Sequence, residues 1–133
     1  MSKLAIIGSR NFTDFSIGYT LTDKYIDYLF LEKKIDVKLV VSGGANGADL
    51  FGKKYSRARK LRYKEYPAEW DKYGKRAGMI RNKDIIDECT CAIIFWDGIS
   101  RGTKNSIDLI MSKGVPYKIV MYTVKENDEW YNM

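Results

Sequence analysis

Short apolar runs that end at polar or glycine-containing loops constrain the fold of this chain most strongly. Leu4–Ile7, Val37–Val41 and Cys91–Trp96 are these runs, and Tyr117–Tyr122 is expected to be a fifth strand. A run that is apolar at nearly every position is typical of a strand covered on both faces, as in parallel sheets flanked by helices. The runs therefore predict the buried strands of an α/β protein.

Helical patterns separate these strands. Apolar residues at helical spacing, or capping signals, predict helices over residues 17–34, 48–58, 73–88 and 103–113. In the last of these helices Thr103 is the expected N-cap, and Gly114 is expected to end the helix. Arg62–Tyr66 is polar on both faces and precedes a proline, so it is expected to be an edge strand. The alternation predicts an α/β Rossmann-like three-layer sandwich with a mainly parallel five-stranded sheet in the order 3-2-1-4-5.

Chain length and composition limit both the domain organisation and the chemistry. With 133 residues, 45% of them hydrophobic, the chain is expected to form a single domain over residues 1–133. Its polar tail, residues 124–133, could dock, fray or serve an oligomer contact. The chain has no histidine, which excludes Ser-His-Asp and Cys-His catalysis and imidazole metal sites. We expect neither a metal nor a resident cofactor.

Charge and cysteine content indicate the kind of partner and the cellular compartment. The 23 Lys and Arg residues exceed the 17 Asp and Glu residues, a net charge of +6, which favours an anionic partner. Cys89 and Cys91 are too close for a zinc site or a disulfide framework and are expected to be buried, reduced thiols. No apolar run approaches the ~20 residues of a membrane span. These features predict a cytoplasmic protein without a membrane partner.

The loops that follow the strands carry the residue types of a binding site. In an open parallel sheet, ligands bind beyond the carboxyl ends of the strands, where the strand order reverses. The expected loops there are rich in glycine, hydroxyls and fixed charges. The candidate ligand-binding residues are Gly8, Ser9, Arg10, Ser42, Gly43, Gly44, Asn46, Gly47, Asp49, Trp70, Arg81, Asn82, Trp96, Asp97, Ser100, Gly102, Thr103 and Lys104.

Two of these loops have the composition of phosphate cradles. Gly43, Gly44 and Gly47 let the backbone approach a ligand, and free amides at the start of the next helix suit a phosphate or carboxylate. Residues 97–104 form a second such loop, with Lys104 as a point charge. Their spacing matches neither G-x-G-x-x-G nor G-x-x-x-x-G-K-[ST], which disfavours dinucleotide cofactors and P-loop hydrolysis. A ligand-free turn is the alternative for each loop, but two at one sheet edge favour a binding site.

Several single residues have two interpretations. Asp49 either complements the helix dipole or accepts hydrogen bonds from a ribose. Arg81, like Arg10 and Arg76, either binds a phosphate or is simply solvated. Trp70 or Trp96 is expected to stack on a base, although Trp96 can equally belong to the core.

Five sequence blocks in order resemble the YspA, cpYpsA-related branch of the SLOG superfamily. These blocks are Gly8–Arg10, Ser42–Asp49, Pro67–Trp70, Ala77–Asn82 and Trp96–Thr103, and the resemblance covers about residues 4 to 122. It implies a Rossmann-like domain that binds a nucleotide or a nucleotide-derived small molecule, such as an ADP-ribose-like, cyclic or modified nucleotide. It also implies sensing or sequestration of that molecule in phage or mobile-element conflict, and a homodimer.

Two more distant resemblances imply alternatives. Arg81-x-Lys83 and Gly102-Thr103 are similar to motifs of the LONELY GUY phosphoribohydrolases, which split N-glycosidic bonds in nucleotides. Ser106 stands where those enzymes have their catalytic Glu, and this departure places binding above hydrolysis. Gly8–Arg10 and Ser42–Asp49 are similar to loops of DNA-processing protein A, which implies single-stranded DNA as a second choice of partner. Whether the chain is an enzyme stays open at this point.

Overall fold

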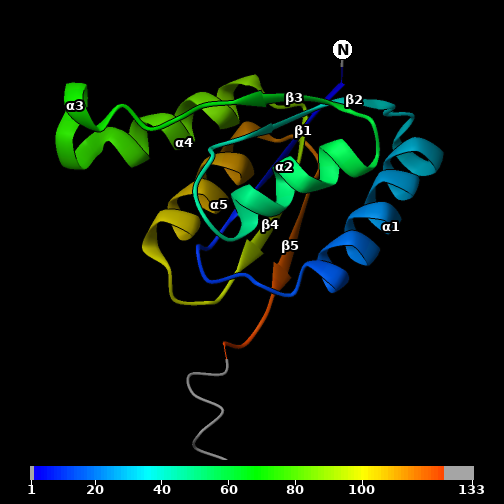
Figure 1. The fold of residues 1–133 in the computed structure, drawn as a ribbon. Helices are drawn as coiled ribbons and strands as arrows, with labels where there is room; N and C mark the ends of the chain where they lie inside the picture. Colours follow the sequence, from blue (N-terminus) through cyan, green and yellow to red (C-terminus); the bar gives the residue numbers. More distant parts are fainter. Residues whose placement is uncertain (1, 125–133) are drawn as a thin grey trace, which may run out of the picture.

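A computed structural model describes residues 2–124 (Figure 1). Its elements in chain order are β1 (Ser2–Gly8), α1 (Phe15–Lys33), β2 (Val37–Ser42), α2 (Ala48–Ala58), β3 (Arg62–Glu65), α3 (Trp70–Tyr73), the 3-10 helix η1 (Gly74–Arg76), α4 (Ala77–Glu88), β4 (Cys91–Trp96), α5 (Arg101–Lys113) and β5 (Tyr117–Met121). The expected polar tail lies, from residue 125 onward, outside the described residues. Within residues 2–124 no helix is both long and apolar enough to cross a membrane.

The five strands form one parallel sheet in the order β3-β2-β1-β4-β5. The chain first moves outward from β1 to β3 and then crosses back to β4, which pairs with β1 from Leu4↔Cys91 to Gly8↔Phe95. The strand order therefore reverses between β1 and β4. The predicted Rossmann-like fold and strand order are confirmed.

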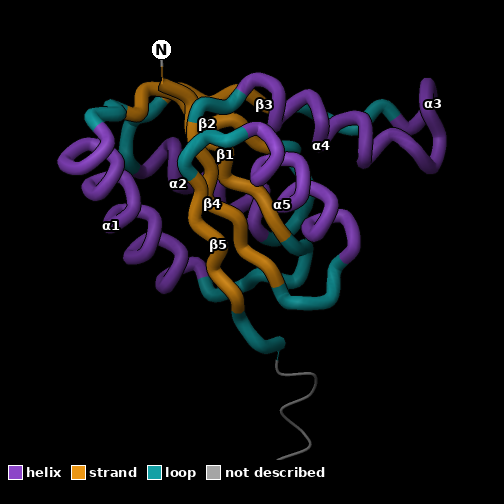
Figure 2. The backbone as a smooth tube through the Cα atoms, turned by 180° about the vertical axis from the view of Figure 1, so that it is seen from behind, coloured by secondary structure: helices purple, strands orange, loops and turns teal. Residues whose placement is uncertain are grey.

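Side-chain alternation along the buried strands divides the core into two layers. Leu4 and Ile6 of β1 belong to the cluster that holds Phe51 of α2. Ala5 and Ile7 point the other way, into the cluster that also holds Ile85 of α4, Ile107 and Ile110. Helices α1 and α2 accordingly cover one face of the sheet, and α4 and α5 cover the other (Figure 2).

The helix boundaries differ from the sequence prediction in two places. The single helix expected over residues 73–88 is interrupted at Gly74, whose φ of +58° is left-handed, so α3 and η1 precede α4. In both backbone views α3 lies away from the body of the sheet (Figures 1 and 2). The last helix begins earlier than predicted, because Ser100 rather than Thr103 is its N-cap. Thr103 instead lies in the first turn and is buried.

The aromatic cluster on the α1–α2 face should dominate stability. The Phe51 ring is fully buried and contacts the rings of Phe12, Phe95 and Tyr55. Truncation to alanine in Phe51→Ala removes these contacts and leaves a cavity, so we expect a loss of about 3–5 kcal/mol in unfolding free energy. Urea unfolding monitored by circular dichroism measures the loss. Phe30→Ala, at a side chain that is 54% exposed, is the control and should change stability by no more than about 0.5 kcal/mol.

Candidate ligand-binding site

Two adjoining cavities open at the carboxyl edge of the sheet. The α5 cavity, of about 490 Å³, is lined by residues from the loop after β1, the loop after β2, α4 and the start of α5. The β3 cavity, of about 510 Å³, is lined by the loop after β2 and by residues that end or follow β3. Arg10, Ala45 and Arg81 line both cavities. The two cavities therefore form one groove, as expected where the strand order reverses.

A backbone contact joins the first two loops. Ala48 N–H donates to the Ser9 carbonyl at 3.2 Å. Gly47 has a φ of +77°, and a Cβ there would lie 2.4 Å from the same Ser9 oxygen. The loop of residues 42–49 therefore lies directly on the Ser9–Arg10 segment. Because the two segments are so close, only glycine fits at position 47 without strain.

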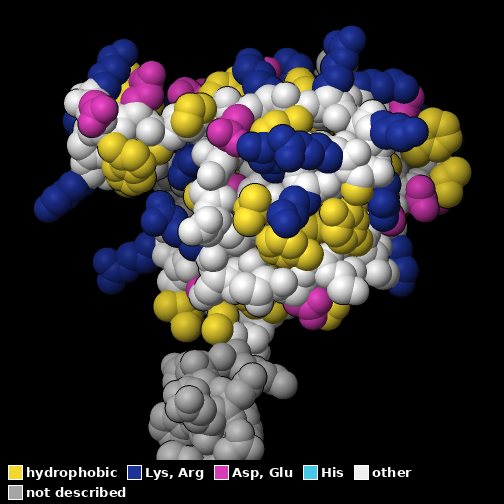
Figure 3. Space-filling model, viewed as in Figure 1, with side chains coloured by type: hydrophobic (Ala, Val, Ile, Leu, Met, Phe, Trp, Pro, Cys, Tyr) yellow, Lys and Arg dark blue, Asp and Glu magenta, His cyan; other side chains and the backbone are white. Residues whose placement is uncertain are grey.

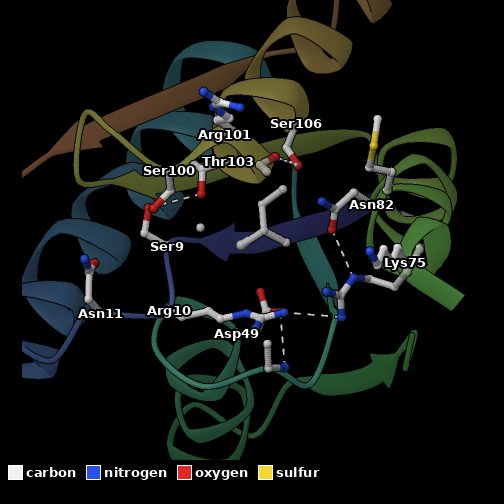
Figure 4. A pocket seen from close by; sticks show the side chains of 17 residues that line it. Ser9, Arg10, Asn11, Asp49, Lys75, Asn82, Ser100, Arg101, Thr103 and Ser106 are labelled. Carbon is white, nitrogen blue, oxygen red and sulfur yellow. Dashed lines mark hydrogen bonds and ion pairs between the residues drawn. The ribbon is translucent and has the colours of Figure 1, made fainter. Parts of the chain in front are cut away.

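The start of α5 forms one side of the α5 cavity. The first intrahelical hydrogen bond runs from Lys104 N–H to the Ser100 carbonyl (3.1 Å), so the amides of residues 101–103 precede it. The Ser9 and Thr103 hydroxyls are hydrogen-bonded to each other at 3.1 Å. Figure 4 shows Ser100, Thr103 and Ser106 on one side of the cavity, with Arg10 and Asp49 opposite. Helix amides facing a basic side chain create a site suited to an anion.

Asp97 fixes this helix start from outside the cavity. One carboxylate oxygen accepts hydrogen bonds from the Ile99 and Ser100 amides at 2.9 and 2.8 Å. The other accepts from the Ser100 hydroxyl at 2.8 Å and from Asn11 at 2.9 Å. Burial alone would raise the pKa of Asp97, but these hydrogen bonds outweigh it and hold the pKa well below its ordinary value. Asp97 is therefore an ionised anchor of the loop.

Asp49 and Arg81 are two buried charged residues of the α5 cavity, and Arg81 also lines the β3 cavity. Asp49 is only 5% exposed, and its Oδ2 accepts a hydrogen bond from the Ala45 amide at 3.2 Å. Arg81 donates from Nη1 to the Gly43 carbonyl at 2.6 Å, which leaves Nη1 3.9 Å from Asp49 Oδ2. Burial raises the pKa of Asp49 to about 6, although Arg81 and the Ala45 amide favour the charged form. Asp49 lies in the first turn of α2, where a negative charge complements the helix dipole, and it also holds the loop through the Ala45 amide.

Thirteen of the eighteen predicted residues line the groove. Those on the α5 cavity are Gly8, Ser9, Arg10, Asp49, Arg81, Asn82, Ser100, Gly102 and Thr103, and those on the β3 cavity alone are Gly43, Gly44, Asn46 and Trp70. Trp70 is 51% exposed there and available for stacking. The predicted convergence of separate loops is thus present.

The other five predicted residues lie outside both cavities. Gly47 and Asp97 act through the loop contacts described above, and the Ser42 hydroxyl donates to the Ile6 carbonyl at 2.7 Å. Trp96 packs against the α4–α5 core layer and donates from Nε1 to the Ser100 carbonyl at 3.1 Å. Lys104 is exposed and paired with Asp108 at 2.6 Å. The side chains of Ser42, Trp96, Asp97 and Lys104 thus all have partners within the protein.

Sequence reasoning missed several lining residues. Lys75 and Met79 line the α5 cavity just after the break at Gly74, which the helical pattern did not reveal. Arg101 lines the same cavity because α5 starts early. Glu65 lines the β3 cavity, and its place at the end of a strand was a signal that the sequence did offer.

The fold and site define a Rossmann-like α/β domain with a basic groove at the carboxyl edge of its sheet. No protein-family profile and no curated protein sequence matches the chain. Among solved structures, DNA processing protein A from Streptococcus pneumoniae is similar, with a TM-score of 0.69 and 18% identity over 95% of this chain and 52% of that one. The chain therefore spans about half the length of that protein.

A second similar structure concerns the single-stranded DNA binding mode of DNA processing protein A from Helicobacter pylori. Its TM-score is 0.65, with 20% identity over 98% of this chain and 70% of that one. At such identities both likenesses show a shared fold.

The buried Asp49 carboxylate predicts a specific pH dependence. Its pKa of about 6 in the fold lies above the ordinary 3.8, so between these values the folded protein binds more protons than the unfolded chain. Stability should therefore fall as the pH rises from about 4 to about 6. Asp49→Asn keeps an oxygen for the Ala45 amide and buries no charge, so it should remove a fall of roughly 2 to 3 kcal/mol.

Urea unfolding of both proteins across this pH range measures the effect. A variant that keeps the full pH slope would show that another group titrates.

Proposed function

We propose that this protein binds a nucleotide or a nucleotide-derived small molecule in the groove formed by the α5 and β3 cavities. The observation that carries the proposal is the convergence of three loops on one groove with a helix start and several cations. Arg10, Lys75, Arg81 and Arg101 all line the α5 cavity. A phosphate there can receive hydrogen bonds from the first amides of α5 and charge from the arginines.

The positions of the amides favour the α5 side for the phosphate. In the loop after β2, the Ala45 amide donates to Asp49 and the Ala48 amide to Ser9, so these donors are used within the protein. The amides at the start of α5 precede the first intrahelical bond. The glycine loop after β2 therefore serves mainly to shape the groove, and the loop before α5 provides the anion site.

The carboxylates of the α5 cavity support binding over N-glycosidic hydrolysis. Asp49 is the one carboxylate that lines this cavity among the described residues, and it is buried and held by the Ala45 amide. Ser106 lines the cavity and donates its hydroxyl to the Gly102 carbonyl at 3.3 Å. Asp108 points outward to Lys104. Within the described residues, the α5 cavity therefore has no exposed carboxylate that could stabilise an oxocarbenium-like transition state there.

The wider proposal follows the resemblance to the YspA, cpYpsA-related branch. Residues 1–133 would act as one SLOG-like domain that senses or sequesters its ligand, as a cytoplasmic homodimer, in phage or mobile-element conflict. The two cysteines, both buried free thiols, support a reducing compartment.

Removing Arg10 should weaken nucleotide binding without affecting the fold. Arg10 is exposed, lines both cavities and makes no hydrogen bond or ion pair within residues 2–124. Loss of one charge-assisted phosphate contact in Arg10→Ala should weaken affinity about tenfold or more. Lys104→Ala is the matched control, because it removes an equal charge from a residue outside both cavities.

Calorimetry and thermal shift measure these affinities with NAD, ADP-ribose, cyclic ADP-ribose isomers, cyclic dinucleotides and 5′-nucleoside monophosphates. A uniformly flat screen of the unmodified protein would contradict the proposal. Equal losses in both variants would show that only long-range charge acts.

Single-stranded DNA is a second candidate ligand. The structures of DNA processing protein A that share this fold favour it, and one of them concerns single-stranded DNA binding. The net charge of +6 and the exposed Trp70 are also compatible with a nucleic-acid strand. The groove is then the place where the strand would lie.

Competition separates the two candidates. If the groove is built for a small nucleotide, a short oligothymidylate should bind no tighter than the roughly micromolar level of non-specific contacts at physiological salt, and should not displace bound nucleotide. Fluorescence anisotropy over a salt series measures its affinity and the number of phosphates contacted. Tight oligonucleotide binding that displaces ADP-ribose would favour the DNA function.

A further inference from the structure

We infer that the groove selects ribonucleotides over deoxyribonucleotides, with Glu65 as the residue that determines this specificity. The inference rests on the proposed nucleotide-binding function and assigns the orientation of the ligand. Its phosphate lies in the α5 cavity and its ribose beside Glu65 in the β3 cavity. The Glu65 carboxylate accepts hydrogen bonds from the ribose hydroxyls.

The distribution of charge along the groove sets this orientation. The α5 cavity is lined by four cationic residues, and Asp49, its one lining carboxylate in the described chain, is buried. The β3 cavity shares Arg10 and Arg81 but adds an exposed carboxylate, Glu65. A phosphate beside Glu65 would face a like charge, whereas at the α5 end it faces cations and helix amides. The uncharged part of a nucleotide therefore belongs beside Glu65.

The local structure holds the Glu65 carboxylate in place with acceptor capacity to spare. Tyr63 O–H donates to Glu65 Oε1 at 3.0 Å, which leaves Oε2 and one further lone pair available. Gly44 makes room for this carboxylate, because a Cβ at Gly44 would lie 2.6 Å from Glu65 Cδ. No ion pair joins Glu65 to a cation within residues 2–124. The protein thus orients the Glu65 carboxylate and leaves acceptor sites on it for a ligand.

The two cavities together offer partners for each part of a nucleotide. Glu65 touches Gly44, whose chain neighbour Ala45 lines both cavities, so the carboxylate lies next to the junction with the phosphate site. Pro67 and Trp70 line the same cavity further along the chain, and the Trp70 side chain is half exposed. With the phosphate at the cations of the α5 cavity, Glu65 is available to the ribose and Trp70 to the base in the β3 cavity.

Binding of matched ribo- and deoxyribonucleotides tests the inference. The probes are the 5′-monophosphates of adenosine, guanosine, cytidine and uridine, each compared by calorimetry with its 2′-deoxy counterpart. Because a hydrogen bond to a charged acceptor contributes more than a neutral one, the unmodified protein should prefer the ribonucleotide by about tenfold. Glu65→Gln keeps the size of the side chain and an oxygen for Tyr63, and it should reduce the preference to about twofold or less. Glu69→Gln, which removes an equal charge from a residue that lines neither cavity, should keep the full preference.

The outcomes separate this inference from the proposed function. Equal affinity of the unmodified protein for ribo- and deoxyribonucleotides overturns the inference and leaves nucleotide binding intact. If Glu65→Gln raises the affinity for the ribonucleotide and the deoxyribonucleotide equally, the carboxylate acts by repulsion alone and the inference is wrong. If no monophosphate binds while ADP-ribose or NAD does, the inference fails and the proposed function stands. If no nucleotide of either panel binds, both are overturned.

Discussion

The contact between the glycine loop after β2 and the backbone after β1 determines the shape of the groove. Gly47 occupies a left-handed conformation, and the Ser9 carbonyl lies where a side chain would begin. The Ala48 amide donates to that same carbonyl, so this amide at the start of α2 is not available to a ligand. With these two segments in contact, Arg10 lies at the junction where it lines both cavities. The groove is therefore open toward α5 and β3, and closed over the start of α2.

Three carboxylates around this groove are in three different states. Asp97 is ionised and saturated with hydrogen bonds, and so holds the start of α5. Asp49 is buried, and its raised pKa reflects desolvation that a guanidinium 3.9 Å away does not offset. Glu65 is exposed and oriented by one tyrosine. Because only Glu65 combines exposure with spare acceptor sites, only this carboxylate is free to recognise a ligand.

The sequence predicted the centre of the sheet well because β1 and β4 are buried on both faces. Leu4 and Ile6 belong to one core layer while Ala5 and Ile7 belong to the other, so each of these four successive positions of β1 must be apolar. The site was predicted less completely, because the direction of a side chain depends on tertiary contacts. Lys104 and Thr103 are neighbours in sequence, yet one pairs with Asp108 at the surface and the other faces the cavity.

The break at Gly74 shows that the path of the backbone also depends on tertiary contacts that the sequence does not reveal. A glycine within a helical pattern is tolerated or ends the helix, and local sequence does not decide between these outcomes. Here the left-handed turn at Gly74 separates α3 from α4 and accompanies the placement of Lys75 on the α5 cavity. The sequence therefore shows a lysine at position 75, but it does not predict that this lysine lines the α5 cavity.

The arrangement of charge distinguishes a compact ligand from an extended strand. Proteins that bind single-stranded nucleic acid without sequence preference use a basic groove that follows the backbone and several aromatic platforms. In this structure four cations line the α5 cavity and two of them, Arg10 and Arg81, also line the β3 cavity, where a carboxylate and a half-exposed tryptophan are added. On the face shown in Figure 3, Lys and Arg side chains are spread among acidic and apolar ones rather than forming a stripe. A second phosphate further along the groove would meet Glu65, whereas one phosphate followed by a sugar and a base would not, so the charge pattern favours a small nucleotide-derived ligand.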